Sequence, residues 1–329
     1  MPQCQIYDFR ICESYKISLN NNHIVNHMEL RQLRYFIAVA EELHFGKAAL
    51  RLHMTQPPLS QTIQALEEEL GAALFERNRR GVALTPAGLA LLPEARRMLA
   101  QAQELPQLVQ RAAAGEVGRL TLAFVSSADY SVLPPFLRAY RAAYPQVQIT
   151  LQEATSDLQL DDLLHSRIDA GLLIPPLPDK ARLELDYLPV LNEALMLALP
   201  AGLPGVKKKG KLALRALPPL PLIIFPRAIS PALYDAILSV FREAGITPEI
   251  GQQAIQMQTI VSLVSAGMGM ALVPQSVSNL MRPGVEYRAL DDATPLVETG
   301  LAWRRDNASP VLRGFLDLLR KELRKPALC

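Results

Sequence analysis

The side chains best suited by type and spacing to bind another molecule lie near the start of one predicted helix. Apolar residues at 59, 63 and 66 recur at helical spacing, so they turn inward and leave the polar residues of the segment exposed. Glutamine can pair bidentately with adenine, serine can bond base edges or phosphates, and proline can touch a thymine methyl group. This chemistry favours contact with DNA, and a solvated polar helix face is the alternative. The predicted set is Thr55, Gln56, Pro57, Ser60, Gln61 and Gln64.

A second group of binding side chains consists of arginines in a predicted turn. Two short segments, 74–77 and 82–85, flank the turn and read as the strands of a hairpin. Arg77, Arg79 and Arg80 would lie at its tip, where guanidinium groups suit phosphates or a narrow minor groove. A solvated turn is the alternative. Residues 28–115 carry ten basic and nine acidic side chains, so local placement rather than bulk charge carries the prediction.

Three predicted helices position these side chains. Apolar spacing indicates one helix over 29–42, a second over 45–53 with small residues on its packing side, and a third from Thr55 to Gly71 with two prolines in its first turn. Three helices that are joined by short turns and followed by a hairpin form a winged helix-turn-helix. We predict this DNA-binding domain over 28–85. Residues 1–27 are predicted to be a disordered extra tail before a natural start at Met28, and a functional arm is the alternative.

The same region resembles the LysR-type transcriptional regulators, without a gap from Met28 to Gly88. The resemblance implies DNA contacts at Gln56, Pro57, Pro58, Ser60 and the wing arginines. Many relatives carry arginine where this chain has Gln61, so a phosphate or guanine contact at that position is not expected to carry over. The motifs are Leu33-Arg-Tyr-Phe-Ile-Ala-Val-Ala-Glu, Thr55-Gln-Pro-Pro-Leu-Ser, Leu66-Glu-Glu-Glu-Leu-Gly and Leu84-Thr-Pro-Ala-Gly.

A long amphipathic helix is predicted next, as a linker over 86–116. Thr85 and Pro86 form a cap-plus-proline start, and apolar residues recur to about Ala114. The resemblance implies that this helix pairs with its twin in a dimer, which presents two DNA-binding heads to a palindromic site. A core helix within one chain is the alternative. Pro93 and Pro106 are expected to bend or interrupt the helix.

The remaining residues, 117–329, alternate apolar strands with helices, which predicts α/β architecture with a parallel sheet. The resemblance is looser here and implies an effector domain of two lobes like a periplasmic binding protein. Lobe I is predicted over about 117–188 and 290–325, and lobe II over about 189–289. The whole chain is therefore expected to be an α+β multidomain protein. The strands are predicted at 120–125, 147–152, 168–174, 195–199, 222–225, 270–273 and 301–304.

Hydroxyl side chains follow the first two of these strands, where ligands bind in open α/β sheets. Hydroxyls and free amides suit a carboxylate, so we expect a small organic effector, including carboxylic acids. A capping box from Ser156 to Gln159 is the alternative role for that serine. Segment 172–178 is apolar and proline-rich where some aromatic-acid sensors carry polar groups, which argues against a charged contact there. The predicted effector residues are Ser126, Ser127, Thr155 and Ser156 from lobe I, and Phe225, Pro226, Met257, Gln258 and Thr259 from lobe II.

Two other classes of protein fit less well. An enzyme is opposed because the chain has no Gly-x-Ser-x-Gly, His-Glu-x-x-His or phosphate-loop motif, and neither a catalytic residue, a metal site nor a cofactor is expected. A transport-associated binding protein is opposed by the fused DNA-binding module and by a start without a secretory apolar region. Cysteines occur only at 4, 12 and 329, and no apolar run approaches the ~20 residues of a membrane span. The expected partners are double-stranded DNA, further copies as a dimer or tetramer, the effector and RNA polymerase, in the cytoplasm and without a membrane.

Overall fold

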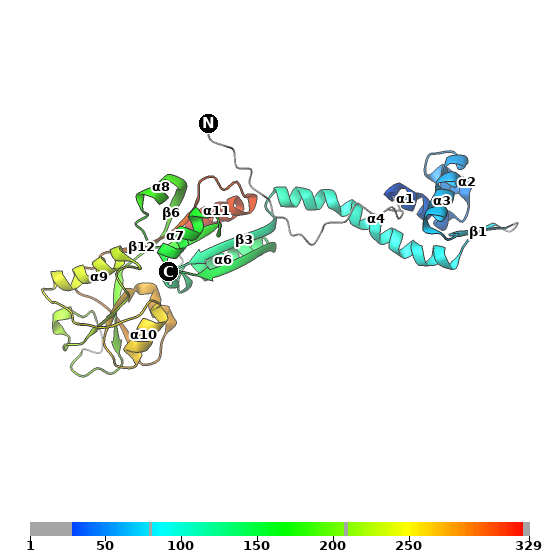
Figure 1. The fold of residues 1–329 in the computed structure, drawn as a ribbon. Coiled ribbons are helices and arrows are strands. Elements are labelled where there is room, and N and C mark those ends of the chain that lie inside the picture. The colour runs from blue at the N-terminus through cyan, green and yellow to red at the C-terminus, as the bar shows by residue number, and fades with distance from the viewer. Residues whose placement is uncertain (1–27, 79–80, 207–209, 325–329) are drawn as a thin grey trace, which may run out of the picture. The chain divides into compact units, whose positions relative to one another are not determined.

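The chain divides into two compact units, residues 1–106 and 107–329. The computed structural model describes residues 28–78, 81–206 and 210–324 (Figure 1). The predictions made for the 1–27 tail, for Arg79 and Arg80, and for the last residues of the chain lie outside the described residues.

The first unit contains the three helices and the hairpin that the sequence predicts. Helices α1 (Leu30–Glu42), α2 (Phe45–Arg51) and α3 (Gln56–Leu70) precede strands β1 (Phe75–Asn78) and β2 (Gly81–Leu84), which pair antiparallel. Leu59, Ile63 and Leu66 are fully buried, so α3 turns the predicted face inward. Thr55 holds the N-cap position of α3, but its side chain makes no capping hydrogen bond.

The wing and the long helix α4 (Pro86–Ala113) meet at a close backbone approach. The Thr85 hydroxyl donates to the carbonyl of Ala73 at 2.7 Å and accepts from the amide of Gly88 at 3.0 Å. A Cβ atom at Gly88 would lie only 2.2 Å from the carbonyl oxygen of Leu74, so the position needs glycine. Helix α4 is continuous through Pro93 and Pro106, so of the two predicted effects of these prolines, a bend or an interruption, the interruption does not occur.

Lobe I of the second unit is a five-stranded sheet covered on both faces. Its strand order is β4-β3-β5-β12-β6, with β3 parallel to β4 and β5, and β12 antiparallel to β5 and β6. Helices α6 and α11 bury one face, and α7 and α8 bury the other (Figure 1). The strands are β3 (Val117–Phe124), β4 (Gln146–Glu153), β5 (Ala170–Leu173), β6 (Leu185–Glu193) and β12 (Val297–Arg304). The helices are α5 (Ser126–Asp129), α6 (Leu133–Ala143), α7 (Ser156–Leu164), α8 (Asp179–Glu184) and α11 (Pro310–Leu323).

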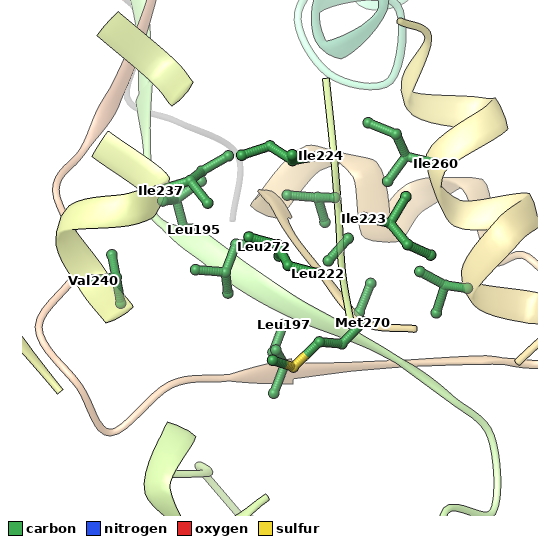
Figure 2. Packing of buried hydrophobic residues seen from close by; sticks show 14 of the residues in the cluster. Leu195, Leu197, Leu222, Ile223, Ile224, Ile237, Val240, Ile260, Met270 and Leu272 are labelled. Carbon is green, nitrogen blue, oxygen red and sulfur yellow. The ribbon is translucent and has the colours of Figure 1, made fainter. Parts of the chain in front are cut away.

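Lobe II repeats this topology. Strands β7 (Leu195–Pro200), β10 (Ala271–Pro274) and β11 (Val285–Ala289) form an antiparallel sheet in the order β10-β7-β11, and β8 (Leu222–Ile224) pairs in parallel with β9 (Ile250–Gln253). A parallel bridge from Leu222 to Met270 joins the two sheets. Helices α9 (Pro231–Glu243) and α10 (Met257–Ser265) contribute side chains to the core, whose aliphatic packing Figure 2 shows. Two short 3-10 helices, η2 (Leu214–Ala216) and η3 (Gln275–Leu280), complete the lobe.

The chain crosses between the lobes twice, at Ala194 between β6 and β7, and again between β11 and β12. The first crossing comes later in the sequence than the predicted boundary at about 188, whereas the second lies in the segment that begins at the predicted boundary of about 290. The predicted parallel pairing is found among β3, β4 and β5, but the sheet as a whole is mixed, because β12 returns from the end of the chain and inserts antiparallel between β5 and β6. Strand β6 was not predicted at all. Its Pro189 is compatible with a strand because β6 is at the edge of the sheet, and it lies opposite Gly300 beside a register shift in the ladder.

Candidate functional sites

The first three turns of α3 carry an exposed polar face. Thr55, the three residues 56–58, Gln61 and Gln64 are exposed, and Ser60 is half-buried. The prolines occupy the first turn, where a missing amide hydrogen removes no intrahelical bond. Gln64 donates its side-chain amide to Glu68 at 3.0 Å, whereas no described residue holds the side chain of Gln61 by a hydrogen bond. The face is therefore rich in uncharged donors and acceptors that can meet base edges.

A glycine brings the start of α2 against this face. A Cβ atom at Gly46 would lie 3.1 Å from the His44 ring and 3.5 Å from Oε1 of Gln56. The amide of Lys47 donates to Nδ1 of His44 at 3.3 Å, which caps α2. Lys47 itself is exposed, and within the described part of the chain no carboxylate pairs with it. Lys47 was not among the predicted DNA contacts, although a basic residue in the first turn of the second helix was a usable signal.

Arg77 is the wing arginine that the structure describes. Its guanidinium carbon lies 4.4 Å from the ring centroid of Phe45, at the start of α2, and that ring packs edge-on against Phe75. The carboxylate of Glu67 fixes the strand by accepting from the amides of Leu74 and Phe75 at 2.7 and 3.0 Å. Cation–π contact orients the exposed guanidinium and leaves its N–H groups available for a phosphate.

Glu41 joins three helices of the same unit. Its two carboxylate oxygens lie 2.7 Å from Arg96 of α4 and 2.8 Å from Arg51 of α2. Hydrogen bonds from Arg96, and then from Arg51, hold the pKa of the carboxyl below its usual value. Because the groups are largely exposed, the pairs orient the helices more than they stabilise them.

A cavity lies between the two lobes of the second unit. The volume of the cavity is about 50 Å³, which suits a ligand of few atoms. None of its lining side chains is charged. The polar lining residues are Ser126, Ser127, Thr155, Ser156, Ser230 and Gln256. The apolar ones include Ile174, Phe225, Ile229, Leu233, Ile255 and Met257.

Donor groups concentrate on the lobe I wall of this cavity. Ser127 is only 3% exposed, and no described residue hydrogen bonds to its buried hydroxyl. The hydroxyl oxygen of Ser156 accepts from the amide of Ile174 at 3.0 Å, so its own proton remains available. Helices α7, α9 and α10 all begin at lining residues or directly after them, and their free amides favour negative charge.

Hydrogen bonds join the short helix α5 of lobe I to lobe II. The hydroxyl oxygen of Ser126 lies 2.6 Å from Oε1 of Gln256 and 2.8 Å from Oε1 of Glu153. The hydroxyl of Ser276 lies 3.3 Å from the carbonyl of Ser127 and 3.0 Å from Glu193 at the first crossing. Burial raises the pKa of the Glu193 carboxyl, although hydrogen bonds from Ser276 oppose this.

Comparison with known proteins assigns both units. The family described as "Bacterial regulatory helix-turn-helix protein, lysR family" matches residues 30–89, and "LysR substrate binding domain" matches residues 113–324. The chain belongs to the LysR family of transcriptional regulators. This regulator therefore has a DNA-binding head and an effector-binding domain, and it is not an enzyme.

Relatives of this regulator match it over nearly their whole length. It is 48% identical over 295 residues to the HTH-type transcriptional regulator IlvR of Caulobacter vibrioides, covering 90% of this chain and 98% of that one. It is 43% identical over 291 residues to AlsR of Bacillus subtilis, covering 88% and 95%. The crystal structure of full-length CbnR complexed with its target DNA matches with a TM-score of 0.75 and 33% identity, covering 90% of this chain and 100% of that one.

The structure brings most of the predicted effector residues together. Ser126, Ser127, Thr155, Ser156, Phe225 and Met257 all line the one cavity. Pro226, Gln258 and Thr259 are not among its lining residues, because α10 turns the latter two outward into exposed positions. Ser156 is not the N-cap of α7, and its partner is Ile174, so the capping-box alternative was wrong.

Two polar lining residues, Ser230 and Gln256, were not predicted from the sequence. Each is the N-cap residue of a lobe II helix, and this position was the signal that could have identified it. Among the described residues, no cluster of three metal-ligating side chains occurs, and no helix is long and apolar enough to cross a bilayer.

Proposed function

We propose that this regulator reads operator DNA with the exposed face of α3 and the wing, and that a small organic acid in the interlobe cavity controls it. The unpartnered, buried hydroxyl of Ser127 in that cavity is the observation that carries the proposal. A buried polar group without a partner costs about 1–3 kcal/mol, so a ligand that bonds it gains affinity.

The DNA contacts divide by chemistry. Gln56, Gln61 and Gln64 would meet base edges, Ser60 and the first-turn prolines would meet bases or the backbone, and Arg77 and Lys47 would meet phosphates. The match to a regulator crystallised with its target DNA supports this arrangement. One head offers few cations, so strong binding needs several heads acting together.

Helix α4 supplies a surface for that assembly. Five of its apolar side chains are exposed: Leu89, Met98, Leu105, Leu108 and Val109. Pairing of two α4 helices would bury them and form a dimer, and two dimers would form a tetramer on DNA. RNA polymerase, in the cytoplasm, is the proposed recipient of the regulatory signal. Ligand binding would act by favouring one arrangement of the heads over another.

The DNA-binding proposal is tested by gel shift with the DNA upstream of the regulator's own gene. Gln56→Ala should weaken the shift by about tenfold, since one bidentate base contact is worth about 1–3 kcal/mol. The control is Gln101→Ala, which removes an exposed glutamine from α4. Equal binding by the two variants would contradict the proposed face.

The ligand proposal is tested by thermal shift with a library of small organic acids. Ser127→Ala should abolish the response to any acid that raises the melting temperature of the wild-type protein. The control Ser262→Ala removes a half-buried α10 hydroxyl that is outside the cavity lining and should respond as the wild type does. A response that survives Ser127→Ala would place the ligand elsewhere.

A further inference from the structure

At one corner of the interlobe cavity, the lining residues Ser126 and Gln256, together with the exposed Glu153 just outside the lining, have more acceptor oxygens than donor hydrogens. Ser126 has a single hydroxyl proton, yet Oε1 of Gln256 and Oε1 of Glu153 lie 2.6 and 2.8 Å from its oxygen. Only one of them can receive that proton. If the Gln256 amide is turned so that its NH₂ donates to Ser126, its oxygen becomes the acceptor without a donor. In either orientation of the Gln256 amide, one acceptor oxygen receives no hydrogen bond from the other two side chains.

Hydroxyl groups that can donate hydrogen bonds lie next to this corner. Ser127 follows Ser126 directly and is almost completely buried, and its hydroxyl has no hydrogen-bond partner among the described residues. Ser156 holds an uncommitted hydroxyl proton in the same lining. These donors, with the amides at the start of α7, suit a carboxylate.

The rest of the lining is aliphatic or aromatic. Side chains from both lobes, including Ile174, Leu233 and Ile255, close the cavity on the sides away from the hydroxyls. With about 50 Å³ open, the apolar part of a ligand has room for a few carbon atoms only. A charged or large substituent would meet no partner there.

We propose that the ligand is a short aliphatic carboxylic acid that carries a hydrogen-bond donor, a hydroxyl or an ammonium group, on the carbon next to the carboxylate. Ser127 and Ser156 bind the carboxylate, and the corner formed by Ser126, Gln256 and Glu153 accepts from the neighbouring donor. This inference rests on the proposed effector function of the cavity and adds the class of acid.

A matched set of four-carbon acids tests the inference by calorimetry on the full-length protein. The probes are butanoate, 2-hydroxybutanoate and 2-aminobutanoate, which differ only in the group beside the carboxylate. A hydrogen bond to a charged partner is worth more than a neutral one, so the amino acid should bind about tenfold or more tighter than butanoate if the donor is an ammonium group. If it is a hydroxyl, the hydroxy acid should bind about threefold or more tighter and exceed the amino acid.

Variants assign the preference to the acceptor corner. Glu153→Gln should reduce the preference for the donor-bearing acid over butanoate by at least about threefold. The control Glu243→Gln removes an exposed carboxylate at the end of α9 and should retain the preference. Unchanged Trp303 fluorescence would show that lobe I of each variant is folded.

Three results would overturn the inference: butanoate binding as tightly as the substituted acids, none of the three acids binding, or Glu153→Gln leaving the preference intact. The proposed function would survive these results if another acid bound in a manner that Ser127→Ala abolishes. Acid binding that Ser127→Ala does not affect would instead refute the proposed function itself.

Discussion

Replacing Gly88 by alanine should destabilise the DNA-binding head, although alanine favours helices. Gly88 lies in the first turn of α4, where helix propensity alone predicts a gain of up to about 1 kcal/mol. The new Cβ atom would lie 2.2 Å from the carbonyl oxygen of Leu74 and 2.8 Å from a methyl carbon of Leu84. Since Cβ atoms essentially never approach closer than 3.0 Å, the helix and the wing must separate.

The magnitude follows from what that separation breaks. Overpacking costs about 1–3 kcal/mol. The hydrogen bond from the Thr85 amide to the Leu74 carbonyl, 3.0 Å long, would also be stretched, which adds about 1 kcal/mol. We therefore expect the free energy of unfolding of the head to fall by about 2–4 kcal/mol.

Urea denaturation measures this change within one molecule. The sole tryptophan, Trp303, is buried in lobe I, so its fluorescence reports the second unit, while circular dichroism reports both. Gly88→Ala should lower the urea midpoint of the head, which is seen by circular dichroism alone. The transition of the second unit, which Trp303 fluorescence also reports, should not change. Gly71→Ala is the control, because Gly71 has φ +66° and open space, so alanine there meets backbone strain of about 1 kcal/mol without a clash. A shift smaller than that of Gly71→Ala, or a stabilisation, would refute the reasoning.

Three further predictions follow from other contacts. A hydrogen bond from Arg96 lowers the pKa of Glu41, so this carboxylate contributes stability at neutral pH. That contribution is lost as the pH falls through the pKa of the folded state. Glu41→Gln should therefore reduce the difference between the urea midpoints of the head at neutral pH and at about pH 4. Burial raises the pKa of Glu193, so the second unit should lose stability as the pH rises from the unfolded to the folded pKa, and Glu193→Gln should flatten that loss in Trp303 fluorescence. Gln61→Arg should add a phosphate contact and steepen the dependence of log affinity on log salt by about 1 per head in anisotropy titrations, whereas an unchanged slope would place residue 61 away from the backbone.

The helices and hairpin of the head were predictable because local signals agree there. The period of the apolar residues located α3, and the turn between the two strands located the wing. The parts of the second unit that could not be predicted depend on distant pairing. Strand β6 exists because β12, more than a hundred residues later, pairs with it, and no local pattern around Pro189 indicates that.

The candidate cavity was predictable in part for the same reason. Ser127 and Ser156 follow strands of a recognisable unit, so their position at a sheet edge could be inferred from the order of elements. Gln256 reaches the cavity only because the second lobe folds back onto the first, where it meets Ser126 across 130 positions of the sequence. Pairings of this kind depend on the tertiary fold, to which a single sequence gives no direct access.

The place of β12 in lobe I has a consequence during synthesis. A ribosome delivers β3, β4, β5 and β6 first, then all of lobe II, and only afterwards the strand that lies between β5 and β6. Until Val297–Arg304 emerges, β5 keeps an unpaired edge and β6 has no neighbour in its sheet. Nascent chains that stall before residue 297 should therefore require chaperones, whereas the DNA-binding head, complete by residue 106, can fold as soon as it leaves the tunnel.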